Sequence, residues 1–388
     1  MRAVLTIFAV WAAGLGAAAQ FGKISVAYEA LGAAYGGQGG VAIGLMVSVV
    51  GIVGLIFGTT AGLLVARVGA RRAMLAALVL GAAVSLVQSV FPPFALMMAS
   101  RVLEGVSHLA IVVVGPVAIA AAAPPARQGA AMTLWSSFFG LTYAVLFWLG
   151  PGLIEAGGPG LLFRLHAGWL LACAAVLWAL MPRDVALAAG DRQGGILAGH
   201  LAIYASPFVA GPATGFVFYT ITYVAVLTLL PGLAHDGWGG FIGVAMPLVS
   251  IGVSLTLGVW LLGRMPAWRL VQAGFAVAVA AAAGLWLVWG HGAAEAALAL
   301  AMGAALGVVQ GASFASIPQL NPVPGDRARA AGAIAQLGNL GTTTGTPLLA
   351  WAVTQAGGVA VAPFVLGFSV LGIAVLALQA RRRRAVSA

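Results

Sequence analysis

The sequence predicts an all-α membrane protein of twelve transmembrane helices in two six-helix bundles. Hydrophobic residues make up 62% of the 388 residues and charged residues only 7%, and this leaves too much apolar surface for a soluble protein to bury. A span with its loop takes about 30 residues, so the chain has room for about twelve. The long, continuous apolar runs exclude the short alternating strands of a membrane β-barrel.

The expected helices are the apolar runs between short polar or charged loops. They cover residues 3–33, 41–66, 72–91, 94–123, 129–153, 165–182, 200–231, 240–263, 268–290, 294–320, 330–356 and 359–380. The N-terminus resembles a signal peptide, but its apolar run continues through Val26, so we expect a retained first helix. A polar stretch containing Asp184 and Arg192 predicts three parts: an N-terminal bundle (1–182), a cytoplasmic linker (183–199) and a C-terminal bundle (200–388).

The arginines alternate with the apolar runs. Short loops that remain in the cytoplasm are rich in Lys and Arg. With the N-terminus inside, the cytoplasmic loops and tails hold every basic residue except Lys23, Arg101 and Arg164. The opposite loops carry three acidic residues, Glu155, Asp236 and Glu295. The charge pattern predicts a bacterial-type inner (plasma) membrane protein with both termini cytoplasmic.

The net charge of +10 would suggest nucleic-acid binding in a soluble protein. In a membrane protein the excess follows from topology and faces anionic lipid. We therefore expect the lipid bilayer, and no nucleic acid, as a partner.

An internal repeat relates the two halves. Glu104-Gly105 and Ser107 correspond to Gln310-Gly311 and Ser313 at one constant offset along the chain. Many secondary transporters are built from such repeats, with substrate sites at the repeat interface.

Two segments resemble signatures of the major facilitator superfamily. Residues 62–72 resemble the loop signature between its second and third helices, through Gly62, Arg67, Gly69, Arg71 and Arg72. Arg101-x-x-Glu104-Gly105 resembles its fourth-helix signature. The resemblance implies the twelve-helix fold of that family, alternating access, and a conformational role for the five loop residues. Ala66 replaces the acidic residue of the loop signature, which implies a weaker latch for the outward-facing state.

Glu104 is the most informative single residue, because a charge within an apolar span costs roughly 2.5–3.5 kcal/mol. Arg101 and His108 lie on the same face of the expected helix. We interpret Glu104, Arg101 and His108 as a proton-coupling cluster. The alternative is a structural Arg101–Glu104 pair.

Lys23 is the only lysine of the chain and lies one turn from Gln20. The resemblance places their helix beside the central cavity, where an ammonium would suit an anionic substrate. The alternative is that Lys23 reaches the outer membrane interface near Glu29.

Further candidate substrate-binding residues lie in the C-terminal half. Tyr219 and Tyr223 could form an aromatic wall, or else a packing stripe or interfacial belt. Four polar residues could line the cavity or join helices by hydrogen bonds: Gln310, Ser313, Gln336 and Asn339. Gly341 and Gly345 permit close helix approach, and the resemblance implies a sliding contact there between the two halves.

We expect no enzyme activity, no cofactor and no bound metal. The sequence has no phosphate-binding Gly-x-x-x-x-Gly-Lys-Ser/Thr loop, and its single cysteine, Cys173, excludes an internal disulfide. The predicted protein is a monomeric secondary transporter for the proton-coupled uptake of a small, anionic organic solute. The alternatives are a proton-coupled exporter of drug-like compounds and an importer of a metal ion or a cofactor or vitamin.

Overall fold

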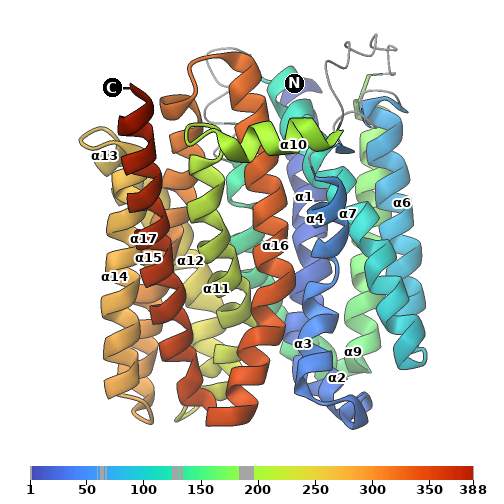
Figure 1. Ribbon diagram of the computed structural model, residues 1–388. Coiled ribbons are helices and arrows are strands. Elements are labelled where there is room, and N and C mark those ends of the chain that lie inside the picture. Colours follow the sequence, from blue (N-terminus) through green and yellow to red (C-terminus); the bar gives the residue numbers. More distant parts are fainter. Residues whose placement is uncertain are drawn as a thin grey trace. The chain divides into compact units, whose positions relative to one another are not determined.

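The computed structural model describes residues 2–58, 60–61, 65, 68–124, 131, 134–182 and 196–387. Regular structure in these residues is helical throughout (Figure 1). Nine of the described helices are long and apolar enough to cross a membrane, and ten segments qualify if one bent pair counts as a span. The prediction of an all-α membrane fold is confirmed, while the number twelve stays a prediction.

The chain divides into two compact units, an N-terminal unit (Met1–Gly190) and a C-terminal unit (Asp191–Ala388). The N-terminal unit contains α1 (Arg2–Val26), α2 (Tyr28–Ala34), η1 (Gly36–Gln38), α3 (Gly40–Ser48), α4 (Gly51–Phe57), α6 (Ala70–Gln88), α7 (Phe94–Ala122) and α9 (Phe138–Leu180). The C-terminal unit contains α10 (Ile196–Ala205), α11 (Gly211–Leu233), α12 (Gly239–Val253), the π-helical η3 (Ser254–Gly258), α13 (Val259–Leu262), α14 (Ala267–Leu287), α15 (Gly292–Leu320), α16 (Pro324–Ala356), η4 (Gly358–Ala360) and α17 (Val361–Ser387).

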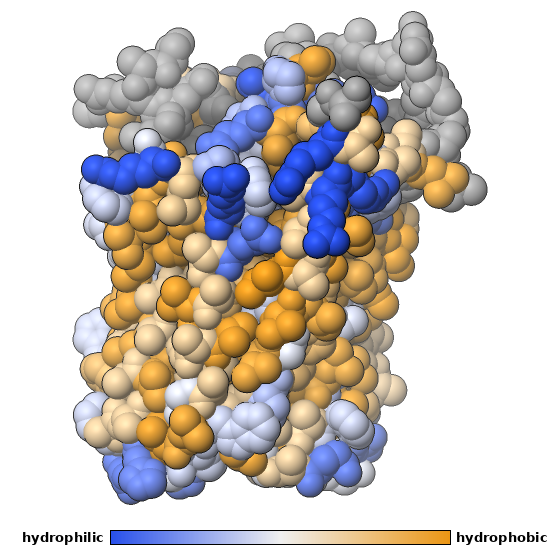
Figure 2. Space-filling model, turned by 60° about the vertical axis from the view of Figure 1, so that its left-hand side comes forward, coloured by the Kyte–Doolittle hydropathy of each residue, from blue (hydrophilic) through white to orange (hydrophobic). Residues whose placement is uncertain are grey.

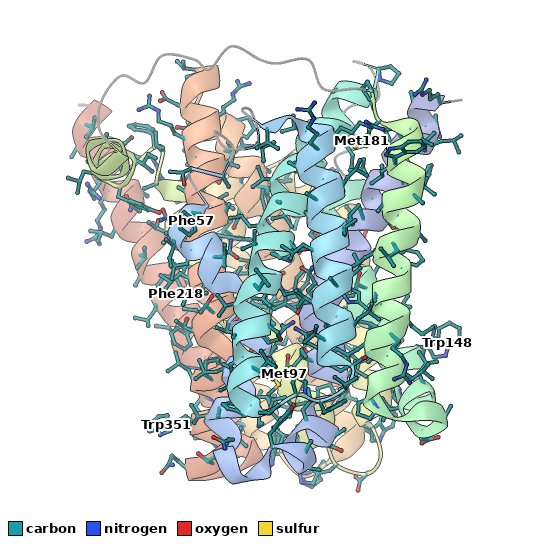
Figure 3. The ribbon with its side chains drawn as sticks, turned by 90° about the vertical axis from the view of Figure 1, so that its right-hand side faces the viewer. Phe57, Met97, Trp148, Met181, Phe218 and Trp351 are labelled. Atoms are coloured by element: carbon teal, nitrogen blue, oxygen red, sulfur yellow. The ribbon has the colours of Figure 1, made fainter. Side chains whose placement is uncertain are left out.

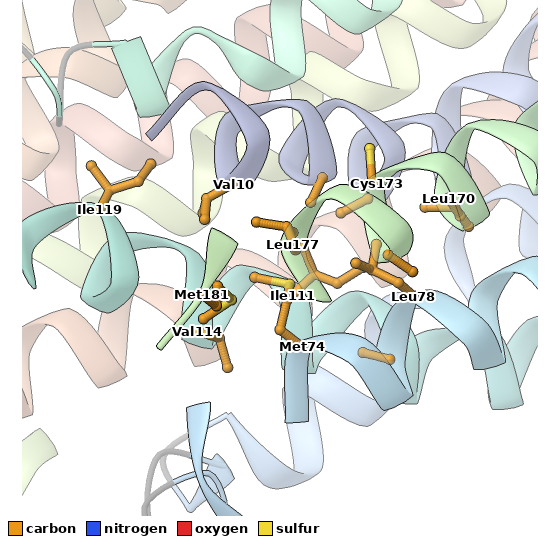
Figure 4. Packing of buried hydrophobic residues seen from close by; sticks show 14 of the residues in the cluster. Val10, Met74, Leu78, Ile111, Val114, Ile119, Leu170, Cys173, Leu177 and Met181 are labelled. Carbon is orange, nitrogen blue, oxygen red and sulfur yellow. The ribbon is translucent and has the colours of Figure 1, made fainter. Parts of the chain in front are cut away.

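Helices α1, α6, α7 and α9 form the centre of the N-terminal unit. A cluster of buried apolar side chains joins them, among them Val10 of α1, Leu78 of α6, Ile111 of α7 and Leu170 of α9 (Figure 4). The cluster lies toward one end of these helices and fixes their spacing. Polar side chains of the same four helices meet next to it.

The two units repeat one packing scheme. In the N-terminal unit α7 packs against α1, α4 and α6, and α9 packs against α1 and α6. In the C-terminal unit α15 packs against α11, α12 and α14, while α11 packs against α16 and α14 against α17. Each contact thus has a counterpart in the other unit, as the repeat in the sequence predicts.

A short turn at two glycines stands where we expected a longer loop between residues 153 and 165. Helix α9 runs from Phe138 to Leu180, and its only non-helical backbone is at Gly157 and Gly158. The φ of Gly158 is +68°, a left-handed conformation that favours glycine. Pro159 follows in the first turn of the second arm, where its missing N–H costs nothing.

The expected helix 200–231 is wrong, because α10 ends at Ala205 and α11 begins at Gly211. Pro207 has no N–H to donate and disfavours helical geometry in the residue before it. Pro212 then lies in the first turn of α11. The expected start of the helix 330–356 is also wrong, because α16 begins at Pro324.

The predicted span 41–66 is broken in its described part. Helices α3 and α4 are bent by 55° relative to each other. The bent pair lies against α7: a Cβ at Gly105 would lie 2.4 Å from the carbonyl oxygen of Val50. Only glycine allows this approach.

On the face that Figure 2 shows, the middle is mostly apolar and hydrophilic side chains gather toward the two ends. Trp148 points outward from α9 and is 71% exposed, whereas Met97 is buried (Figure 3). This distribution suits helices that have lipid as their solvent.

Gly341 and Gly345 contact α11 of their own unit. A Cβ at Gly341 would lie 2.0 Å from Oγ1 of Thr220, and one at Gly345 would lie 2.0 Å from the carbonyl oxygen of Ile221. These glycines therefore bring α16 against α11 within the C-terminal unit, and a sliding contact of their helix with the other half stays a prediction.

Candidate functional site

Three charged side chains lie fully buried where α1, α6, α7 and α9 meet. Lys23 comes from α1, and Arg101 and Glu104 come from successive turns of α7. All three have an exposed fraction of 0%. Because desolvating an isolated charge is costly, each of them must be satisfied by neighbouring groups.

Both carboxylate oxygens of Glu104 accept hydrogen bonds. Oε1 accepts one from Nζ of Lys23 at 2.7 Å. Oε2 accepts one from Nε2 of Gln88 at 2.9 Å and a second from Nη1 of Arg101. The carboxylate thus bridges an ammonium and a guanidinium.

Arg101 also joins α7 to α3. Its Nε donates to the carbonyl oxygen of Met46 at 2.8 Å, and its Nη2 donates to that of Val47 at 3.2 Å. These carbonyl groups lie next to the bend between α3 and α4. The guanidinium therefore holds Glu104 and the bent pair together.

The ammonium of Lys23 has three acceptors for its three N–H groups. They are Oε1 of Glu104, Oγ of Ser85 at 2.9 Å and Nδ1 of His166 at 3.3 Å. The ring of Phe163 lies 4.9 Å from Nζ and adds a cation–π contact. The structure excludes the alternative in which Lys23 reaches the membrane interface near Glu29.

The hydrogen bonds of His166 fix its tautomer. Nε2 lies 2.9 Å from the carbonyl oxygen of Gly16, which can only accept, so Nε2 carries a proton. Nδ1 faces the Lys23 ammonium, which can only donate. We therefore assign a neutral imidazole whose Nδ1 accepts from Lys23.

The cluster carries an excess positive charge. Lys23 and Arg101 contribute two cations and Glu104 one anion, so their formal sum is +1. A neutral His166 leaves this sum unchanged. A buried site of this charge is chemically suited to accept an anion.

His108 and Gln20 lie farther along the contact between α1 and α7. Nδ1 of His108 donates to the carbonyl oxygen of Ala17 at 3.1 Å, and its ring packs edge-on against Phe21. Nε2 of Gln20 donates to Oγ of Ser107 at 2.9 Å. Both residues bridge the two helices, and a role of His108 in proton coupling stays a prediction.

Tyr219 and Tyr223 stack on each other in α11. Their ring centroids are 5.0 Å apart, and both residues are 3% exposed. Phe216 extends the row, with its ring 5.2 Å from that of Tyr219. Their burial excludes a lipid-facing aromatic belt, while the role of a substrate wall stays a prediction.

The polar candidates of α15 and α16 have different surroundings. Oγ of Ser313 and Nδ2 of Asn339 donate to backbone carbonyl groups one turn earlier in their own helices. Gln336 accepts a hydrogen bond from the hydroxyl of Tyr204 at 2.8 Å, which ties α16 to α10. Gln310 is half-buried. Their binding of substrate stays a prediction.

The candidate conformational loop is described in part. Gly62 and Arg67 lie outside the described residues. Gly69 precedes α6 with a φ of +96°, which requires glycine. Nη2 of Arg71 donates to the carbonyl oxygen of Trp178 at 2.6 Å, and Arg72 is exposed.

Three residues of the cluster were not among the predicted site residues: Ser85, Gln88 and His166. Each one is a polar residue in an otherwise apolar span, and this was the available signal. Their chain positions gave no indication that they would meet at Lys23 and Glu104.

The described residues contain no group of three or more His, Cys, Asp or Glu side chains that could hold a metal ion. The cluster is instead an ionic site with cations in excess.

The apolar helices and the buried ionic cluster define a multi-pass membrane protein with charged groups in its interior. The sequence matches the profile of the Major Facilitator Superfamily over residues 6–341, and the chain belongs to this family. None of the curated proteins compared with the chain matches it. As a member of this family the chain is a secondary transporter.

Proposed function

We propose that the protein couples protons to the uptake of a small organic anion across the inner membrane by alternating access. The observation that carries the proposal is the buried Lys23–Glu104–Arg101 cluster with its excess positive charge. The arginine-rich loops support an orientation with cytoplasmic termini.

In this mechanism the carboxylate of Glu104 and the substrate anion compete for the same donors. While Glu104 is ionised it occupies an N–H group of Lys23 and one of Arg101. A proton on Glu104 weakens both interactions, because a neutral carboxyl attracts cations less strongly. The ammonium of Lys23 is then available to the substrate.

The charge balance couples the two ligands. Protonation alone raises the formal charge of the cluster from +1 to +2, which is costly in a buried site. Binding of a monoanion returns the charge to +1. A proton and a monoanion therefore stabilise each other's binding, and we expect one proton to accompany each monoanion.

The test uses the purified full chain in liposomes that contain a pH-sensitive dye. A panel of poorly permeant anions is added outside: lactate, succinate, citrate, gluconate and glucuronate. We expect at least one anion to acidify the lumen through the wild-type protein and none to do so through Glu104→Gln. The variant should still exchange the same anion, labelled, across the membrane.

Lys23→Ala supplies a second readout, since it should weaken binding of the active anion. Two results would overturn the proposal: failure of every anion in the panel, or equal acidification by Glu104→Gln. Proton movement driven by a lipophilic cation such as ethidium instead would favour the exporter of drug-like compounds.

A further inference from the structure

A cavity of about 260 Å³ opens at one end of the C-terminal unit, whereas the candidate site belongs to the N-terminal unit. Four apolar and two basic residues line it: Phe208, Trp268, Leu320, Ala380, Arg383 and Arg384. None of these lining residues is acidic. They come from the start of α14, the ends of α15 and α17 and the segment before α11, so the cavity lies where the apolar spans end.

Arg383 is held in place as a structural part of this cavity. Its exposed fraction is 7%, whereas Arg381, Arg382 and Arg384 are exposed. Its Nη1 donates to the carbonyl oxygen of Pro207 at 3.3 Å, and its guanidinium lies 5.5 Å from the ring of Trp268. A guanidinium fixed in this way presents a positive charge to the cavity with little loss of side-chain entropy on binding.

The three large apolar side chains of the cavity remain accessible. Phe208, Trp268 and Leu320 are half-buried. A ligand in the cavity can therefore place a charged group at Arg383 and pack the start of a hydrocarbon chain against these three apolar side chains.

We propose that this cavity binds an anionic phospholipid. Its phosphate pairs with Arg383 and Arg384, and the start of an acyl chain packs against Phe208, Trp268 and Leu320. A small soluble anion would satisfy only the guanidinium groups, and a zwitterionic lipid would bring no net charge to balance them. An anionic phospholipid satisfies both parts, and basic pockets between transmembrane helices are suited to such headgroups.

The experiment is a titration of the purified full chain with phosphatidylglycerol, followed by native mass spectrometry. Arg384→Gln removes an exposed arginine that lines the cavity, and Arg381→Gln is the matched control, an exposed arginine of the same helix end outside it. We expect Arg384→Gln to weaken binding about fivefold and Arg381→Gln to bind like the wild type. Equal losses in the two variants would indicate general charge attraction and overturn the site.

Two further arms separate the lipid from its headgroup. Trp268→Ala should also weaken binding of phosphatidylglycerol, because it removes apolar contact area. Water-soluble glycerophosphoglycerol and the zwitterionic phosphatidylcholine should fail to displace the bound lipid. Displacement by glycerophosphoglycerol would show a simple anion site, and equal binding of phosphatidylcholine would show a neutral lipid contact. Either result overturns the proposal.

Discussion

Nζ of Lys23 lies 2.7 Å from Oε1 of Glu104, and neither side chain is exposed. The other carboxylate oxygen of Glu104 is bonded to Arg101. One anion therefore lies between two cations, and removal of the anion should have a larger effect than removal of either cation. This asymmetry leads to a test by substitution.

We expect Glu104→Gln to destabilise the protein by about 3–5 kcal/mol, because it leaves two unbalanced cations in the interior. Lys23→Met should cost less, since it leaves the Arg101–Glu104 pair. The double variant Lys23→Met/Glu104→Gln should be more stable than Glu104→Gln alone, because one of the two cations is gone. Thermal unfolding in detergent measures all three.

A substrate anion should also raise the unfolding temperature of Glu104→Gln more than that of the wild type, because it replaces the missing carboxylate. If the double variant is less stable than both single variants, the electrostatic account of the cluster is wrong.

His166 should stabilise the protein through its hydrogen bonds to Lys23 and to the carbonyl oxygen of Gly16. His166→Leu leaves an N–H of Lys23 and the carbonyl oxygen of Gly16 without this partner. Each lost partner should lower the free energy of unfolding by about 1–3 kcal/mol. His166→Asn should lose less, because an amide can both accept and donate. Chemical or thermal unfolding distinguishes the two variants.

His291→Leu is the control for this comparison, since His291 is exposed and its replacement should have little effect. Equal losses in His166→Leu and His166→Asn would argue that only the volume of the ring matters.

The sequence was sufficient to identify the ionic residues and a possible Arg101–Glu104 pair, but not the contacts of Lys23. Charges within apolar spans identify Lys23, Arg101 and Glu104, because lipid makes such residues costly. Lys23 is 81 residues from Glu104 and 143 residues from His166. Contacts over such separations depend on the rotation of each helix about its axis, which hydropathy does not determine.

Helix boundaries were predictable where charged loops mark them, and less so elsewhere. Apolar runs located the spans, but the turn at Gly157-Gly158 is short enough to be hidden between two apolar arms. Conversely, Pro207 and Pro212 indicated the break before α11, but the apolar residues around them led us to expect one continuous helix. Gly341 and Gly345 correctly indicated a close helix approach, but the sequence did not identify α11 as the neighbour.

Gly345 should tolerate no larger residue. A Cβ there would lie 2.0 Å from the backbone oxygen of Ile221, so Gly345→Ala must push α16 away from α11. We expect this to lower the free energy of unfolding by about 1–3 kcal/mol or more. Gly367→Ala is the matched control, because nothing lies within 4 Å of the added methyl group. It should stabilise α17 by about 0.5–1 kcal/mol.

Thermal unfolding of the two alanine variants gives shifts of opposite sign if this packing is correct. A loss of stability in Gly367→Ala equal to that in Gly345→Ala would mean that the α11–α16 contact is not the cause.

The orientation in the membrane can be tested with single cysteines. Cys173 is 6% exposed, so it should react little and can be replaced by alanine for a clean background. His291→Cys lies in the exposed loop before α15, and Val386→Cys lies at the 68% exposed end of α17, beyond the four arginines. Since basic segments remain in the cytoplasm, a membrane-impermeant maleimide should label His291→Cys in intact spheroplasts. It should label Val386→Cys only after permeabilisation. Labelling of both positions from the same side would contradict the predicted topology, and with it the direction of transport that we propose.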